Sequence, residues 1–174
     1  MEFTPDMGLT WERTDALNDK ESVFAIQPTI LIHVNKKLQM LCRTKSGKIY
    51  SAWSTDNGSS WTKLEPTALP NPDSGIDAIT LKDGRHLLVY NHISSSKRNI
   101  LNVAISEDGV NWEAAVLLEN DSDENNEYSY PAVIQTKDGN VHITYTWKRE
   151  LIKHVVKDPL KIKTKPIING NWPE

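Results

Sequence analysis

Short runs in which apolar and polar residues alternate dominate this chain. Residues 141–147 read Val-His-Ile-Thr-Tyr-Thr-Trp, so every second side chain is apolar or aromatic. Successive side chains of a β-strand point to opposite faces, and this period of two therefore predicts a half-buried strand. The predicted strands are 29–33, 38–43, 49–54, 77–81, 86–91, 101–106, 132–136, 141–147 and 152–156. No segment keeps an apolar period of about 3.6 residues, so we expect little helix.

A turn motif recurs between these strands. Residues 4–11 read Thr-Pro-Asp-Met-Gly-Leu-Thr-Trp, residues 54–61 Ser-Thr-Asp-Asn-Gly-Ser-Ser-Trp, and residues 106–112 Ser-Glu-Asp-Gly-Val-Asn-Trp. In such a turn the Asp can accept bonds from backbone amides, the Gly permits a positive φ, and the Trp can cover the turn. Turn chemistry accounts for every fixed position, so we interpret the motif as structural rather than catalytic.

The spacing of the motif predicts the architecture. Its copies start at residues 4, 54 and 106, and repeats of about 40–50 residues in all-β sequence are typical of four-stranded propeller blades. We expect one all-β unit over residues 1–174, with about three four-stranded antiparallel blades. The predicted segments are blades at 24–65, 74–118 and 128–158, the end of a preceding blade at 1–20, and a C-terminal tail at 159–174.

About three blades are too few to close a ring, which typically has about 4–8. An open half-ring exposes two apolar faces. We therefore expect either self-association or an N-terminal half outside this chain to close the propeller. The tail lacks a clear strand pattern, and we do not expect it to complete the last blade.

Composition narrows the classes of function. With 20 Lys and Arg against 23 Asp and Glu the net charge is −3, which disfavours a nucleic-acid partner. The apolar runs are far too short to span a membrane, and no signal peptide is visible. The lone Cys42 excludes an internal disulfide, and the five histidines lack metal-ligand spacing. We expect no metal and no cofactor.

The turn motifs resemble the Asp-box (BNR) repeats of the sialidase, or neuraminidase, superfamily. Further resemblance is carried by the segments 27–30, 74–78, 87–91 and 127–131, and it extends over nearly the whole chain. It implies the C-terminal half of a six-bladed β-propeller. It also implies a glycoside hydrolase that acts on terminal acidic sugars of glycans, through arginines around the substrate carboxylate, a Tyr nucleophile with a partner Glu, and an Asp acid/base.

The resemblance assigns roles to several residues. Tyr128 matches the Tyr-Ser of the nucleophile, and Tyr130, two residues on and on the same face of a regular strand, is the alternative. Arg43 and Arg98 match two of the carboxylate-binding arginines, since a guanidinium fork binds a carboxylate bidentately. Gln27 and Asn91 are further candidates for substrate binding. The acid/base Asp and the remaining Arg belong to blades that precede this chain.

One position departs from the family pattern. Gln27 stands where the partner Glu of the nucleophile is expected, and Gln cannot accept a proton at neutral pH. Asp77 or Glu127 would then assist Tyr128, because both lie where a first strand begins. Three hypotheses stay open: a sialidase-type glycosidase, a carbohydrate-binding propeller without turnover, and a different glycosidase or polysaccharide lyase on the same scaffold.

Overall fold

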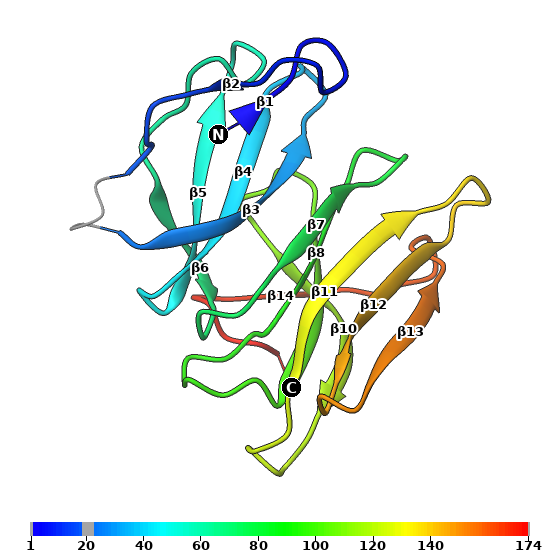
Figure 1. Cartoon of the computed structure of the whole chain (residues 1–174). Helices are drawn as coiled ribbons and strands as arrows, with labels where there is room; N and C mark the ends of the chain where they lie inside the picture. The colour runs from blue at the N-terminus through cyan, green and yellow to red at the C-terminus, as the bar shows by residue number, and fades with distance from the viewer. Residues whose placement is uncertain (1, 19–22, 174) are drawn as a thin grey trace.

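The computed structural model describes residues 2–18 and 23–173, and these residues form strands and loops but no helix (Figure 1). Among the described residues there is thus no helix that could cross a membrane. The strands are β1 (Glu2–Phe3), β2 (Glu12–Arg13), β3 (Ala25–Ile32), β4 (Leu38–Thr44), β5 (Lys48–Ser54), β6 (Glu65–Pro70), β7 (Asp77–Thr80), β8 (His86–Tyr90), β9 (Ile100–Ser106), β10 (Glu113–Asn120), β11 (Tyr128–Gln135), β12 (Val141–Trp147), β13 (Leu151–Lys157) and β14 (Lys165–Pro166).

The strands form antiparallel sheets that fan out side by side (Figure 1). The first blade has the order β3-β4-β5-β6, the second β14-β10-β9-β8-β7, and the third β11-β12-β13, while β1 and β2 pair separately. Every strand predicted from the alternation pattern overlaps an observed strand. The prediction of an all-β partial propeller is confirmed.

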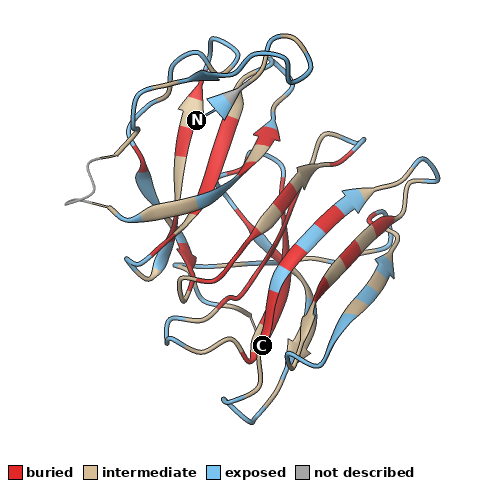
Figure 2. Ribbon diagram, viewed as in Figure 1, coloured by how far each residue is buried: buried red, intermediate tan, exposed pale blue. Residues whose placement is uncertain are grey.

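The innermost strands of the three blades are β3, β7 and β11, with β7 in contact with both of the others. Burial is greatest in the central strands β4, β8 and β9, whereas β13 at the outer edge of the third blade is largely exposed (Figure 2). One apolar cluster lies between the first and second blades and includes Leu31, Leu88 and Tyr90. A second lies between the second and third blades and includes Val103 and Tyr145. The hydrophobic effect therefore holds the blades together face to face.

Asp77 joins the three innermost strands. Its Oδ1 accepts a hydrogen bond from the Thr29 hydroxyl of β3 at 3.1 Å, and its Oδ2 accepts one from the Val133 amide of β11 at 2.8 Å. The Thr29 hydroxyl also contacts the backbone of Ala78 on β7. Both carboxylate oxygens of the partly buried Asp77 thus accept hydrogen bonds from neighbouring blades.

The first and third blades share an irregularity in their inner strands. Gln27 and Pro28 of β3 together lie opposite one residue of β4, and Tyr130 and Pro131 of β11 lie opposite one residue of β12. Gln27 and Tyr130 have φ values of 53° and 51°. These are β-bulges in which a left-handed residue precedes a proline, and a bulge redirects the side chain that it carries.

The repeated turn motif forms the same network in each copy. The hydroxyl of Ser54 donates to Asp56 at 2.8 Å and accepts from the Gly58 amide at 2.9 Å, and the copies at 4–11 and 106–112 repeat both bonds. Hydrogen bonds from the last serine of the turn lower the pKa of Asp56 to about 2. The motif is therefore a turn stabilised by its own side chains.

The C-terminal tail has a role that the sequence does not predict. Its strand β14 pairs with β10 at the outer edge of the second blade, which makes that sheet five-stranded. The third blade keeps three strands. Residues 1, 19 and 20 of the predicted segment 1–20, and residue 174 of the tail, lie outside the described residues.

Candidate functional site

Arginines gather at the end of the fan where the innermost strands begin. Arg43 lies near the end of β4, and Arg98 lies in the loop before β9. Both donate to the backbone carbonyl of Asp73, Arg43 through Nη1 at 3.2 Å and Arg98 through Nη2 at 3.1 Å. Because the two guanidinium groups share one acceptor, they lie side by side.

Glu127 continues this cluster. Its Oε1 accepts from Arg98 at 3.3 Å and from the Ser129 hydroxyl at 2.5 Å, and its Oε2 lies 2.5 Å from Nη2 of Arg149. Partial burial acts to raise the pKa of Glu127, but the Ser129 bond and the two arginines outweigh it and hold the pKa below its ordinary value. Glu127 is thus an ionised partner of the arginines and a weak base.

The two candidate tyrosines lie in different environments, which corrects the expectation that they share a strand face. Tyr128 is only 2% exposed, belongs to the apolar cluster between blades, and donates its hydroxyl to Asp121 at 2.7 Å. Burial and the Asp121 carboxylate raise the pKa of Tyr128. Tyr130 is 51% exposed, because the bulge turns its side chain away from the core.

Tyr130 lies beside the arginine cluster. The guanidinium of Arg98 is 5.8 Å from the centre of its ring, and a Cβ placed on Gly75 would come within 3.2 Å of the same ring. Glycine at position 75 therefore leaves room for the tyrosine. Within the described residues, no hydrogen bond involves the Tyr130 hydroxyl, so this group is available to a ligand.

The remaining predicted site residues lie either on the innermost strands or in the buried interior. Gln27 is exposed at the bulge of β3, in the position equivalent to Tyr130 of β11. Asp77 lies deeper and is occupied by its contacts with β3 and β11. Asn91 is fully buried and donates from Nδ2 to the Ile100 and Tyr128 carbonyls. The structure therefore gives Asn91 a scaffold contact and does not expose it to substrate.

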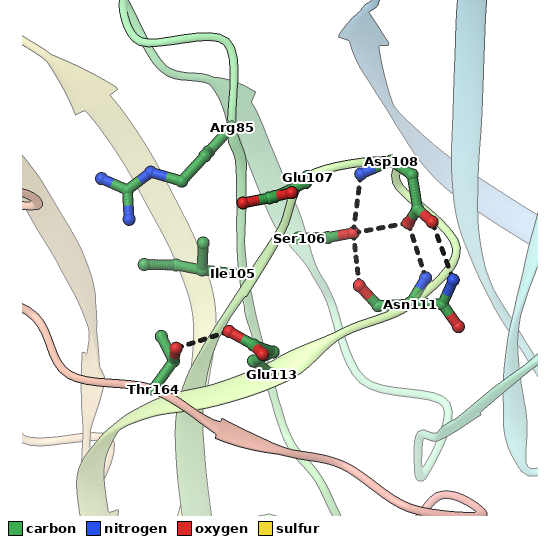
Figure 3. Close-up of a pocket in the computed structure, with 8 residues that line it drawn as sticks. All are labelled: Arg85, Ile105, Ser106, Glu107, Asp108, Asn111, Glu113 and Thr164. Carbon is green, nitrogen blue, oxygen red and sulfur yellow. Dashed lines mark hydrogen bonds between the residues drawn. The ribbon is translucent and has the colours of Figure 1, made fainter.

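A hollow of about 300 Å³ adjoins the arginine cluster, lined by residues 96–98, 124–127 and 149. A different hollow, of about 370 Å³, lies around Ser106 and Asp108 at the far end of β9. Figure 3 shows the side chains that line it. There the side chains of the turn motif bond mainly to one another, including Asn111 Nδ2 to Asp108 at 2.7 Å. Most of their polar atoms are thus used by the turn itself.

Two residues of the arginine cluster, Asp73 and Arg149, were not predicted from the sequence. Asp73 lies in an Asn-Pro-Asp-Ser loop, where its residue type is explained by turn formation alone. Arg149 lies in the tight turn between β12 and β13, where charged residues are common. No local signal distinguishes either residue. The described residues include no group of three or more His, Cys, Asp or Glu side chains placed to hold a metal ion.

The family follows from the sequence as a whole. Residues 1–143 match the model of the BNR repeat-like domain. The chain belongs to the BNR repeat-like domain family. No protein of curated function matches its sequence.

Solved structures resemble this BNR repeat-like chain in fold. The intramolecular trans-sialidase from Ruminococcus gnavus, in complex with oseltamivir carboxylate, superposes with a TM-score of 0.74 at 18% identity, covering 95% of this chain and 39% of that one. The NanB sialidase from Streptococcus pneumoniae gives 0.75 at 15% identity, covering 92% and 27%. The α-L-arabinofuranosidase arb93a from Fusarium graminearum gives 0.62 at 16%, covering 80% and 47%. The chain thus spans less than half the length of each of these proteins and shares their fold.

Proposed function

We propose that this chain recognises the carboxylate of an acidic sugar through Arg43 and Arg98, as part of a sialidase-type glycoside hydrolase. The observation that carries the proposal is the shared acceptor of the two guanidinium groups, which holds them together at the axial end of the fan. Paired arginines recognise carboxylates through charge-assisted bonds. The likeness to sialidase structures supports the same substrate class.

Tyr130 is the better nucleophile candidate of the two tyrosines. A nucleophile must reach the substrate, and Tyr130 is half exposed beside Arg98 whereas Tyr128 is buried. A neutral phenol can approach an anomeric carbon next to a carboxylate without charge repulsion, and sialidases are glycosidases that use a Tyr in this way. Tyr128, with its hydroxyl on Asp121, would instead support the inner strand.

Carboxylate recognition is tested by calorimetric titration with N-acetylneuraminic acid and with its uncharged methyl ester. Arg43→Ala and Arg98→Ala are each expected to weaken binding of the acid by about tenfold to a hundredfold, the effect of losing a charged hydrogen bond of about 1.5–3 kcal/mol. Arg85→Ala is the matched control, because Arg85 lies at the opposite end of the blade and pairs with Asp83. Unchanged affinity in both site variants would refute the proposal.

Turnover is tested with a fluorogenic sialoside. In a form of the protein that hydrolyses the sialoside, we expect Tyr130→Phe to abolish release of the fluorophore. Tyr128→Phe should lower the stability of the fold and leave release of the fluorophore largely intact. The reverse pattern would restore Tyr128 as the nucleophile.

A carbohydrate-binding propeller without turnover is the second candidate, and Gln27 favours it. The side chain at this position cannot act as a base, and Glu127 is already committed to Arg98, Arg149 and Ser129. Binding of the acid sugar without release of the fluorophore, in this chain and in a longer form, is the result that supports it.

A further inference from the structure

The segment between β6 and β7 brings a single residue against both site arginines. Asp73 accepts from Arg43 and Arg98 at its backbone carbonyl, and its Oδ1 lies 3.5 Å from Nε of Arg43. The Oδ1 and Nε atoms are both buried and have no other partner among the described residues. Asp73 thus contacts both arginines through its backbone carbonyl and Arg43 also through its carboxylate.

The conformation of Asp73 makes this arrangement possible. Its φ is 56°, in the left-handed region that Asp and Asn tolerate better than other residues with a side chain. The loop around it is anchored, because the amide of Ser74 donates to Asn71 Oδ1 at 2.9 Å and the amide of Asn71 donates to the Gly47 carbonyl at 3.0 Å. The Asp73 carbonyl therefore has a fixed orientation toward the arginines.

Two adjacent guanidinium groups repel each other unless an acceptor lies between them. The Asp73 carbonyl supplies that acceptor and uses one donor of each arginine. A guanidinium has five N–H donors, so most donors of the pair remain for an incoming anion. The arrangement is preorganised: the arginines are ordered before the ligand arrives, which reduces the entropic cost of binding.

We propose that Asp73 is the positioning residue of the Arg43–Arg98 pair, acting through its left-handed backbone and its acceptor oxygen. This inference rests on the proposed function, since it assigns to Asp73 the alignment of the arginines that bind the sugar carboxylate. Asp73 does not itself bind the sugar in this scheme. Its substitution should therefore affect binding of the charged form selectively.

The test compares the affinity of each variant for N-acetylneuraminic acid with its affinity for the methyl ester. Asp73→Ala, which disfavours the left-handed backbone and removes the side-chain oxygen, should weaken binding of the acid by about tenfold and leave the ester unchanged. Asp73→Asn keeps both features and should stay within about threefold of the wild type. If the alanine variant does not fold, Asp73→Gly replaces it as a test of the side-chain oxygen alone, because glycine keeps the left-handed conformation accessible. Weaker binding of the acid with unchanged binding of the ester is again expected.

Asn57→Ala is the matched control. Asn57 has a φ of 59° in the turn motif at the opposite end of the first blade, so this change introduces similar backbone strain far from the arginines. Its ratio of acid to ester affinity should equal that of the wild type. If Asp73→Ala acted only by destabilising the fold, it would leave the ratio of acid to ester affinity unchanged, as Asn57→Ala does.

Two results would refute the positioning role of Asp73, and a third would refute the proposed function on which it rests. If Asp73→Ala keeps the wild-type ratio while Arg43→Ala loses it, the positioning role is refuted and carboxylate recognition stands. If Asp73→Asn loses as much as Asp73→Ala, conformation and acceptor oxygen are not the cause, and the role is again refuted. If Arg43→Ala and Arg98→Ala both bind as the wild type, the proposed function itself fails.

Discussion

A chain of side-chain hydrogen bonds crosses from the first blade to the second and should make stability depend on pH. His33 Nε2 donates to Gln39 Oε1 at 3.1 Å, and Gln39 donates in turn to the Gly109 carbonyl at 2.8 Å. With both imidazoles neutral, His33 Nδ1 accepts from His86 Nε2, 3.1 Å away, and His86 Nδ1 accepts from the Thr80 hydroxyl. This order of donors requires both imidazoles to be neutral.

The size of this change in stability with pH follows from the burial of His86, which is 1% exposed. Burial, with the neighbouring His33, lowers the pKa of His86 to about 4 from its usual 6.5. The unfolded chain therefore binds a proton that the folded chain rejects, so stability is complete above about pH 6.5 and falls as the pH drops toward 4. Linkage then gives a loss of about 2 kcal/mol between about pH 8 and pH 5.

The measurement is urea unfolding followed by tryptophan fluorescence at these two pH values, with the free energy extrapolated to water. His86→Gln should reduce the pH-dependent loss by about 2 kcal/mol, even though the variant starts less stable. A residual dependence is expected from His33 and His92, since burial lowers the pKa of each. His154→Gln, a change at an exposed histidine, should leave the full pH dependence in place.

Equal wild-type stability at both pH values would refute this reasoning. So would a pH dependence in His86→Gln that matches the wild type. The carboxylates of the turn motifs do not confuse the result, because the pKa of Asp56 and of Asp108 is lowered to about 2. Their stabilisation is lost only as the pH falls below about 4.

Other contacts give further expected outcomes. Gly109→Ala should lower the free energy of unfolding in urea by more than about 2 kcal/mol, because the new Cβ would lie 2.0 Å from Gln39 Oε1 and the residue has a φ of 73°. Gly84→Ala, which has a positive φ but open space around it, should lower it by about 1 kcal/mol. Equal losses in the two variants would contradict this expectation. Asp77→Ala should cost about 1–3 kcal/mol because it leaves a buried amide of β11 unpaired, and a variant as stable as the wild type would show that Asp77 does not join the blades. The outer face of the third blade exposes Ile152 at 76%, and we expect sedimentation velocity to show self-association that Ile152→Lys reduces; a wild-type monomer at high concentration would argue against it.

The sequence predicts the fold well because the fold rests on local patterns. Alternation locates the strands, and the turn motifs at 4–11, 54–61 and 106–112 mark the repeat. The tail is the exception. A strand of two residues such as β14 is too short for a pattern, and its place on β10 is decided by tertiary contacts.

The site is predicted only in part, for reasons of geometry. Arg43 and Arg98 lie side by side in the structure: β4 positions Arg43, and the loop before β9 positions Arg98. The tyrosines are a different case, because the strand period assigns Tyr128 and Tyr130 to one face and the bulge reverses that assignment. The role of Asp73 depends on a backbone carbonyl, which residue identity does not reveal.

The bulges of β3 and β11 have a consequence for engineering. Gln27 and Tyr130 occupy the same left-handed position before a proline, although their side chains differ in size and chemistry. The same left-handed geometry before a proline thus occurs with an amide side chain in β3 and with a phenol side chain in β11. Swapping the two residue types, or introducing a carboxylate at position 27, offers a way to install or remove acid–base chemistry on an otherwise unaltered frame.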